Sequence, residues 1–526
     1  MRNMKKWLAT ALALVMVFAM AACAVAATVN VPSDGILKDH TFTAYQIFSG
    51  TYENKVLVDV QWGSGIGSDA FLAALKADTT YGSLFTNCTD AAAVAKVLGD
   101  NNTNTGMANA VAKLAYTHKT GDGTALTSGD NTLDDGYYLV VDTTENVAAG
   151  SAYNTALLQV VGDINIQVKT AAPTVEKKVL EDDKYNENDG YGNGYNDVAD
   201  YNMGDAVPFH LIGSVPDMSR YDTYKYIFHD TLSNGLTAPA ENAVKVYLSA
   251  DKTLDASDNE VTSSFTVRVS GQTITVSIND LKSVSGITNA NYVIVAYTAV
   301  LNQSAVVGLE GNPNVVYLEY SNKPDQSASG DTGNIGKTPE DKVIVFTYEL
   351  DTTKVDGQNQ ETKLEGAQFK LRNADNKWAI VNEAFKVTGW TDAEADGSTL
   401  TSDADGLFKV IGLDDGTYYL KETKAPTGYN LLSSEITVII TATTTNGQSW
   451  TDGQARSALT ALAVTADGKA GTGDTSSGIA GITVANNAGS TLPETGGMGT
   501  TVLYVGGGVL VLAAVVLLIA KRRSNA

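Results

Sequence analysis

The chain has 526 residues, which at about 150 residues per domain predicts roughly three to four domains rather than one compact core. Its 36 basic and 59 acidic side chains give a formal net charge of −23 and a pI near 4.5. This charge argues against a surface that binds nucleic acid or an anionic membrane electrostatically. The four histidines are scattered without zinc-ligand spacing, so we expect no metal site and no cofactor.

The first 26 residues have the features of a secretory signal peptide. Three basic side chains precede an apolar run over residues 8–20, and small residues continue to a predicted cleavage site after Ala26. A lipoprotein signal that modifies Cys23 is the alternative interpretation. Removal of the signal peptide leaves Cys88 as the one cysteine, so the mature chain cannot form an internal disulfide.

The C-terminus combines a short motif, an apolar stretch and a basic tail in that order. The apolar stretch over residues 502–520 is about 28 Å long as a helix, close to the roughly 30 Å hydrocarbon core of a bilayer. The basic cluster after it remains on the cytoplasmic side. We therefore predict a transmembrane helix preceded by a motif whose residues are Leu492, Pro493, Glu494, Thr495 and Gly496.

This arrangement resembles the cell-wall sorting signal of Gram-positive surface proteins. The resemblance implies that a sortase cleaves between Thr495 and Gly496, keeps the Thr495 carbonyl as a thioester and passes it to an amine. It also implies a secreted protein that is anchored transiently in the membrane and finally in the cell wall, with sortase and peptidoglycan as partners.

Two polar linkers, at residues 169–173 and 323–339, divide the remaining chain into three similar pieces. Short alternating apolar runs separated by Gly, Asn and Asp turns recur in each piece. We predict an all-β protein of three tandem Ig-like β-sandwich domains, the first with added short helices over residues 69–76 and 90–98. The predicted segments are a signal peptide at 1–26, an N-terminal domain at 27–170, Ig-like domains at 171–326 and 341–490, and a sorting signal at 491–526.

In the third piece, a lysine, a glutamate and an asparagine point toward the predicted core. Side chains alternate along a strand, so Lys354 ends an apolar stripe that begins at Ile344, while Glu422 and Asn486 each share a face with apolar neighbours. Burial of an isolated charge costs several kcal/mol. Burial also favours a neutral amine, which is a nucleophile, and a protonated acid. We therefore expect a Lys354–Asn486 isopeptide bond whose single, autocatalytic formation uses Glu422.

The same piece resembles the collagen-adhesin B-type domains of Gram-positive pilins. Residues 419–429 read like the E box of that family, and residues 364–371 match its usual second strand. The resemblance covers about residues 341–490 and implies an intramolecular isopeptide bond. Asn487 is an alternative partner that only strand parity disfavours.

The second piece repeats this pattern with Lys177, Asp230 and Asn322. Lys177 shares a strand face with two valines, and Asp230 takes the part of the catalytic acid. The piece resembles the fimbrial isopeptide-forming domain, which implies a Lys177–Asn322 bond. Lys178 is the alternative lysine, but it faces away from the valines.

The first piece is similar to the N-terminal domain of major pilins in residues 40–50 and 135–141, yet no lysine, acid and asparagine trio can be assigned in it. Lys169 lies at its end, just before the linker. In shaft pilins a lysine at this junction accepts the Thr acyl group of the next subunit. The preceding Gln167 and Val168 differ from the usual Tyr-Pro, and an ordinary linker lysine is the alternative.

The acidic tract over residues 181–190 offers oxygen ligands, but its spacing does not match an EF-hand loop. We interpret it as a solvated loop and not as a calcium site.

The sequence thus predicts the structural major subunit of a covalent pilus, not a turnover enzyme. Thr495 of one subunit is joined to Lys169 of an identical subunit, and such a head-to-tail contact generates a fibre. Minor pilins and host or bacterial receptors are further candidate partners. A monomeric, peptidoglycan-anchored adhesin is the alternative function. A surface hydrolase is disfavoured, because the sequence shows no evident Ser/His/Asp arrangement, Cys/His pair or metal cluster.

Overall fold

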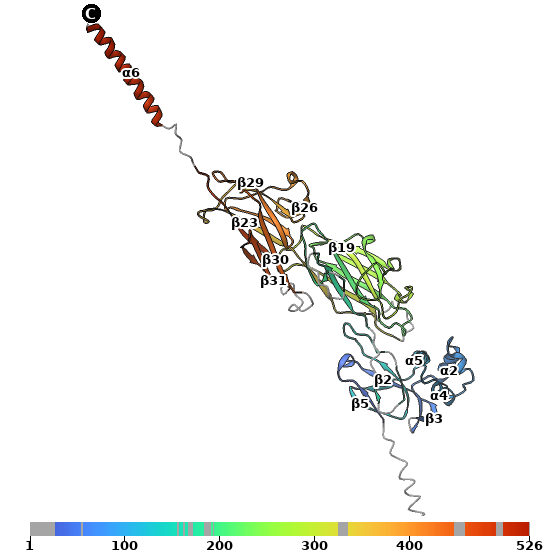
Figure 1. Cartoon of the computed structure of the whole chain (residues 1–526). Helices are drawn as coiled ribbons and strands as arrows, with labels where there is room; N and C mark the ends of the chain where they lie inside the picture. The colour runs from blue at the N-terminus through green and yellow to red at the C-terminus, as the bar shows by residue number, and fades with distance from the viewer. Residues whose placement is uncertain are drawn as a thin grey trace, which may run out of the picture.

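The computed structural model describes residues 27–53, 56–154, 157–160, 164–166, 172–182, 191–192, 194–324, 335–445, 458–490 and 498–524. Three β-rich bodies follow one another along the chain, and an apolar helix ends it (Figure 1). The predicted all-β class with tandem sandwiches is confirmed. The predicted signal peptide and the 492–496 motif lie outside the described residues.

The first body contains two sheets and a helical layer. Its three-stranded sheet consists of β1 (Ala27–Val31), β5 (Gly129–Leu133) and β8 (Ile164–Asn165). The larger sheet consists of β2 (Phe42–Glu53), β3 (Val56–Trp62), β4 (Thr124–Leu126), β6 (Gly136–Asp142) and β7 (Leu157–Val160). The helical segments are η1 (Gly35–Leu37), α2 (Ser68–Ala77), α3 (Gly82–Phe85), α4 (Ala91–Asp100) and α5 (Thr105–His118).

Both helices that the sequence predicts in this body are present, as α2 and α4. Asp90 caps α4, since its Oδ1 accepts a hydrogen bond from Ala93 N at 2.9 Å. Helix α5 was not predicted, because its Asn- and Gly-rich entry resembles a turn. In the structure Asn104 is its N-cap and accepts a hydrogen bond from Met107 N at 3.0 Å.

The second body is a sandwich of two seven-stranded sheets. One sheet holds β9 (Val175–Leu180), β10 (Tyr195–Asn196), β12 (Ala206–Ser214), β14 (Leu236–Thr237), β15 (Lys245–Ser249), β16 (Asn259–Glu260) and β19 (Tyr292–Leu301). The other holds β11 (Val198–Asp200), β13 (Tyr226–Leu232), β17 (Thr266–Ser270), β18 (Thr273–Ile278), β20 (Asn312–Ser321), β21 (Ile335–Lys337) and β22 (Asp341–Phe346). Short 3₁₀ turns are η2 (Glu241–Ala243), η3 (Thr262–Ser264) and η4 (Leu281–Ser283).

The third body pairs a four-stranded with an eight-stranded sheet. The smaller sheet holds β23 (Tyr348–Asp356), β28 (Leu407–Leu413), β33 (Thr472–Asp474) and β34 (Ile479–Asn486). The larger holds β24 (Gln368–Asn373), β25 (Trp378–Val381), β26 (Val387–Thr391), β27 (Leu400–Thr401), β29 (Gly416–Lys424), β30 (Ile436–Thr444), β31 (Leu459–Ala466) and β32 (Lys469–Ala470), and η5 (Glu394–Asp396) lies beside β25.

The junction between the second and third bodies differs from the expected linker. The sequence predicts one apolar stripe from Ile344 to Lys354, but the stripe is divided between two sheets. Strand β22 pairs with β20 and β11, whereas β23 begins the next sandwich after the fully buried Thr347. We therefore propose that the domain boundary lies at Thr347 rather than at residue 341.

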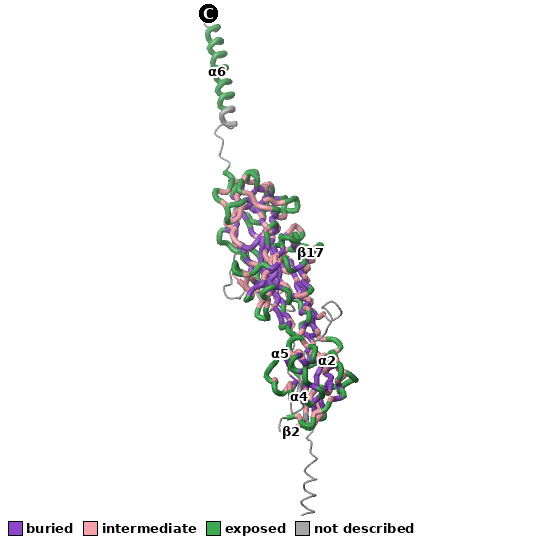
Figure 2. The backbone as a smooth tube through the Cα atoms, turned by 90° about the vertical axis from the view of Figure 1, so that its right-hand side faces the viewer, coloured by how far each residue is buried: buried purple, intermediate pink, exposed green. Residues whose placement is uncertain are grey.

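A single buried apolar cluster extends across this junction. Met203 N donates a hydrogen bond to Gly412 O at 2.9 Å, and Asp414 N donates one to Asn202 Oδ1 at 3.1 Å. Buried segments therefore continue from the second body into the third (Figure 2). The two sandwiches pack as one unit because their interface belongs to a shared core.

The first body contacts the second through side chains and backbone. Lys113 on α5 forms an ion pair with Asp222, and Arg220 Nη1 donates to Asn109 Oδ1 at 3.0 Å. Tyr153 N donates to the backbone oxygen of Asn322 at 2.9 Å. The contacts named here are polar, whereas the described residues of the other junction share an apolar core.

The C-terminal helix α6 (Met498–Ser524) contains an apolar segment, Val502–Arg523, long enough to cross a membrane. It includes the predicted 502–520 span and the following basic residues.

Candidate functional site

The third sandwich brings Lys354, Glu422 and Asn486 together in its interior. Lys354 Nζ donates a hydrogen bond to Asn486 Oδ1 and lies 3.6 Å from Glu422 Oε1. Asn486 Nδ2 lies 2.9 and 3.0 Å from the two carboxylate oxygens of Glu422. The amine, the amide and the acid of the predicted trio therefore contact one another directly.

Strand pairing explains why these side chains meet. Parallel pairing of β23 with β34 sets Lys354 beside Val484. Asn486 lies two residues after Val484, on the same face of β34. Glu422 projects from β29 in the opposite sheet. Asn487, the alternative partner, follows the end of β34 and is exposed, whereas Asn486 is buried.

The environment of Lys354 favours its neutral form. Burial lowers the pKa of Lys354 to about 8, although the nearby Glu422 carboxylate opposes this change. The lysine side chain has no exposed surface, and its Nζ lies 5.6 Å from the centre of the Phe369 ring. An apolar surrounding of this kind provides a nucleophilic amine at a far lower pH than in water.

The second sandwich also buries Lys177 against Asp230. Their side chains form an ion pair with no exposed surface on either partner. Lys177 projects from β9, and Asp230 projects from β13 in the facing sheet. Burial lowers the pKa of Lys177 to about 8, against the opposing effect of Asp230.

The structure does not bring Asn322 to this pair. In the β13–β20 register Asp230 lies opposite Val316, so Asn322 lies about 20 Å further along β20. Its backbone oxygen instead accepts the hydrogen bond from Tyr153 in the first body. Asn322 follows the end of β20, so the structure places it away from the Lys177–Asp230 pair.

Asn314 is the asparagine that lies at the site. It is two residues from Val316 on the same face of β20, and it is completely buried. Its Nδ2 donates a hydrogen bond to the Tyr297 hydroxyl at 2.8 Å, and Lys177 Nζ donates to the same hydroxyl at 3.2 Å. One hydroxyl oxygen thus separates the amine from the amide.

Lys178, the alternative lysine, points away from this site. It forms an ion pair with Asp197, and its Nζ lies 4.3 Å from the centre of the Tyr191 ring. The expected strand parity separates the two neighbouring lysines, as the sequence predicts.

Lys169 and the 492–496 motif cannot be placed, because both lie outside the described residues. Their assignments as acceptor lysine and sortase recognition motif are therefore not tested by the geometry.

Known protein families match three parts of the chain. A prealbumin-like fold domain model matches residues 349–454, and the Cna-B-like domain model of the Gram-positive pilin backbone subunit 2 matches residues 203–324. The LPXTG cell wall anchor motif matches residues 485–526. The chain is a Gram-positive backbone pilin. The anchor motif and the apolar helix α6 identify it as a cell-wall-anchored surface protein.

Individual relatives agree with this family. The trypsin-resistant surface T6 protein of Streptococcus pyogenes serotype M6 is 33% identical to the pilin over 146 residues. That match spans 26% of the pilin and 23% of the relative, so most of the relative's length is not covered.

Two solved structures are similar to the chain, and the first of them has the same overall fold. The structure of the T6 backbone pilin of serotype M6 S. pyogenes, described as modular and three-domain, matches with a TM-score of 0.51 at 17% identity and covers 88% of the pilin and 98% of that chain. The group B streptococcus pilus 2b backbone protein matches at 25% identity with a TM-score of 0.40, over 56% of the pilin and 97% of that chain.

The first body of the pilin contains a polar cluster that the sequence did not suggest. His40 Nδ1 lies 2.7 Å from Asp142 Oδ2, and His40 Nε2 lies 3.5 Å from the Ser151 hydroxyl. Burial alone would raise the pKa of Asp142, but hydrogen bonds from His40, Thr144 and Asn154 outweigh burial and lower it. His40 lies more than a hundred positions before Asp142 and Ser151 in the sequence, so no local motif reveals the cluster.

This Ser/His/Asp geometry has a structural role in the pilin. The carbonyl of Ser151 accepts a hydrogen bond from Tyr320 at 2.9 Å, and the preceding Gly150 N donates to Lys337 O at 2.7 Å. The serine therefore lies in the contact between the first and second bodies. We interpret the cluster as a group that stabilises this contact and not as a catalytic triad.

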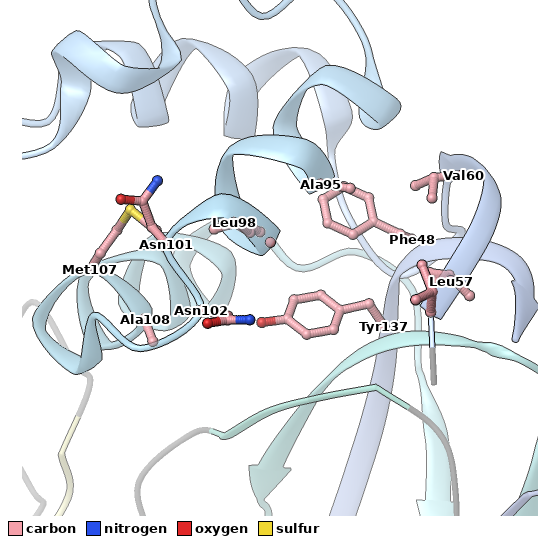
Figure 3. Close-up of a pocket in the computed structure, with 12 residues that line it drawn as sticks. Phe48, Leu57, Val60, Ala95, Leu98, Asn101, Asn102, Met107, Ala108 and Tyr137 are labelled. Carbon is pink, nitrogen blue, oxygen red and sulfur yellow. The ribbon is translucent and has the colours of Figure 1, made fainter. Parts of the chain in front are cut away.

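A cavity of about 470 Å³ opens between β3, α4 and the start of α5 (Figure 3). Apolar side chains that include Phe48, Leu98 and Met107 line it, and Tyr137 and Asn102 contribute polar atoms. The described lining residues include no charged side chain. Such a lining suits an uncharged, largely apolar group.

Three aspartates, Asp200, Asp414 and Asp415, meet at the junction of the second and third bodies. Tyr348 donates a hydrogen bond to Asp200 Oδ2 at 2.9 Å. Burial, together with neighbouring carboxylates that include Asp200, holds the pKa of Asp414 well above its usual value. Glu181, which we expected in a solvated loop, is buried beside this group.

Proposed function

We propose that the protein is the structural shaft subunit of a covalently polymerised pilus and that its two later sandwiches are each closed by an internal isopeptide bond. The direct contact of Lys354, Glu422 and Asn486 in a buried site carries this proposal. Before reaction the site would bury a charged lysine and a charged glutamate, which is destabilising. After reaction it holds a neutral amide in place of these two charges.

In the third sandwich, the lone pair of neutral Lys354 Nζ attacks the Asn486 side-chain carbon. Protonated Glu422 polarises the amide, accepts a proton from Nζ and delivers one to Nδ2. The carbon–nitrogen bond to Nδ2 then breaks, and ammonia leaves. The balance is one amine and one carboxamide converted into one secondary amide and one ammonia.

In the second sandwich, the corresponding bond joins Lys177 to Asn314 with Asp230 as the acid. This replaces the Lys177–Asn322 bond predicted from the sequence. The buried position of Asn314, one hydroxyl from the lysine, supports the replacement.

A sortase would join Thr495 of one subunit to Lys169 of the next and transfer the last subunit to peptidoglycan. The anchor motif and the backbone-pilin domains support this assembly. The result is a head-to-tail fibre. In this role the protein is a scaffold and not a turnover enzyme, since each internal bond forms once.

Intact mass tests the internal bonds. Recombinant residues 27–490 should lack two ammonia masses relative to the sequence, and Glu422→Ala and Asp230→Ala should each restore one. Glu365→Ala, at an exposed site in the third sandwich, is the matched control and should leave the deficit at two. A full-mass unmodified protein would contradict the proposal.

Immunoblots of cell-wall extracts test the polymer. The unmodified strain should give an SDS-resistant ladder, which Lys169→Ala should abolish and the exposed-site control Lys337→Ala should preserve. A single band in the unmodified strain would instead indicate a monomeric wall-anchored adhesin.

The adhesin alternative is favoured by one observation, the uncharged cavity in the first body (Figure 3). Ala95 lines this cavity, so Ala95→Trp should fill it. If the first body binds a ligand there, this variant should lose adherence while retaining its surface display.

A further inference from the structure

The Tyr297 hydroxyl occupies the centre of the reacting groups in the second sandwich. It accepts hydrogen bonds from Lys177 Nζ at 3.2 Å and from Asn314 Nδ2 at 2.8 Å, and it donates one to Asp230 Oδ2. Tyr297 lies on β19, two strands from Lys177 in the same sheet, while the acid and the amide project from the facing sheet. The hydroxyl therefore contacts the nucleophile, the acid and the leaving group.

The third sandwich achieves the same connection without a tyrosine. There the Glu422 carboxylate itself lies 2.9 and 3.0 Å from the Asn486 amide nitrogen and 3.6 Å from the lysine nitrogen. Asp230 is one methylene shorter than a glutamate. Its described hydrogen bonds reach Lys177 and Tyr297, and the tyrosine in turn reaches Asn314.

We propose that Tyr297 is a catalytic residue of the second sandwich, which relays a proton between Asp230 and the departing nitrogen of Asn314. This inference rests on the proposed isopeptide bond of that domain. The relay compensates for the short reach of the aspartate. It adds Tyr297 as a fourth side chain to the lysine, the asparagine and the acid.

The environment keeps Tyr297 in the form that the relay needs. Burial, then the charge of Asp230 and its hydrogen bond, raise the pKa of Tyr297 well above its usual value. The phenol therefore remains protonated, and it can give its proton to one neighbour only while it takes one from another.

The steps balance as follows. Neutral Lys177 Nζ attacks the Asn314 side-chain carbon while Asp230 carries the single shared proton. As the bond between that carbon and Nδ2 breaks, Tyr297 gives its proton to Nδ2 and takes the proton from Asp230. The Asp230 carboxylate then takes one proton from Nζ. Ammonia leaves, the tyrosine is again a phenol, and no external acid, base or oxidant is consumed.

Tyr297→Phe is the direct test, since it removes only the hydroxyl. The full mature chain is made by cell-free synthesis, quenched at intervals and digested, and the two cross-linked peptides are quantified by mass. Bond formation in the third sandwich of the same chain serves as the internal reference rate. We expect the Lys177–Asn314 peptide to form at least tenfold more slowly in the variant, while the Lys354–Asn486 peptide forms at the unmodified rate.

A rescue variant separates catalysis from packing. In Tyr297→Phe combined with Asp230→Glu, the longer acid should reach Asn314 as Glu422 reaches Asn486, and the rate should recover at least partly. A purely structural loss would not respond to the longer acid.

Two outcomes would overturn the inference: an unmodified rate in Tyr297→Phe, or a slow variant that the glutamate does not rescue. Absence of the Lys177–Asn314 peptide from the unmodified chain would instead reject the proposed bond itself.

Discussion

Asn314 Nδ2 lies 2.8 Å from the Tyr297 hydroxyl, inside the second sandwich and next to the buried Lys177. Asn322, eight residues later on the same strand face, lies at the contact with the first body. On the proposal that an isopeptide bond closes this sandwich, this relationship makes Asn314 the partner of Lys177.

Asn314→Ala should therefore restore one ammonia mass to the unmodified protein, whereas Asn322→Ala should restore none. Loss of the link should also destabilise the second sandwich by about 5 kcal/mol on the loop-entropy model for cross-links. Intact mass and thermal unfolding measure the two effects. If Asn322→Ala, and not Asn314→Ala, restores the ammonia mass, the bond joins Lys177 to Asn322 as the sequence predicts.

The rate of bond formation should fall above pH 8. The reactive state is a neutral lysine with a protonated acid, and it holds the same number of protons as the ion pair of a charged lysine and a carboxylate. The ratio of these two states therefore does not change with pH while the shared proton remains in the site. Since burial lowers the lysine pKa to about 8 at both sites, the proton is lost as the pH rises through this value.

The measurement starts from unlinked chains collected in denaturant and diluted into buffers between about pH 6 and pH 10. We expect a plateau and then a tenfold decrease per pH unit, as one titrating proton requires. A plateau that continues to the upper end of this range, near the ordinary lysine value of 10.5, would show that burial does not lower the pKa.

Single-molecule pulling should distinguish the two sandwiches. In the third body the proposed Lys354–Asn486 bond would join the first strand β23 to the last strand β34, so tension would bypass nearly all of the domain. In the second body, residues 315–346 follow the proposed link and stay in the path of the force. This body should extend by on the order of 100 Å, and the third should not extend measurably.

Removal of the ionisable group of Asp414, at the junction of these bodies, should raise stability at neutral pH. The pKa of Asp414 is raised in the folded state by burial first and by nearby carboxylates second. The folded protein then holds a proton that the unfolded chain releases above about pH 4, so stability falls as the pH rises from there.

Asp414→Asn should therefore melt a few degrees higher than the unmodified protein at pH 7 and show a smaller pH dependence. Asn keeps the oxygen that accepts the hydrogen bond from Asp415 N. The exposed-site control Asp375→Asn should leave both unchanged. A lower melting temperature for Asp414→Asn would contradict this assignment.

Strand parity allowed much of the two sites to be predicted. Alternation alone placed Lys177, Lys354 and Glu422 in the cores and directed Lys178 and Asn487 away from them, because each depends only on its own strand. The partner asparagine of Lys177 depends on the register between β13 and β20, which a single sequence does not specify. Parity therefore indicates the face of a strand but not the position along it that meets Lys177.

Contacts between distant segments could not be predicted. Tyr297 looked like an ordinary apolar strand residue, and its role arises only when two sheets face each other. His40, just before β2, likewise pairs with Asp142, at the end of β6, although 102 positions separate them in the sequence. The assignment of β22 was missed because its apolar pattern continues into β23 without a turn residue.

The direct passage from β22 to β23 through buried Thr347 has a mechanical consequence. Only one residue separates the two strands, and the two sandwiches share a core. The sandwiches therefore cannot rotate freely against each other, and a torque applied to one is transmitted to the other. A filament built from such units would bend chiefly where the first body meets its neighbours, and its compliance would recur once per subunit.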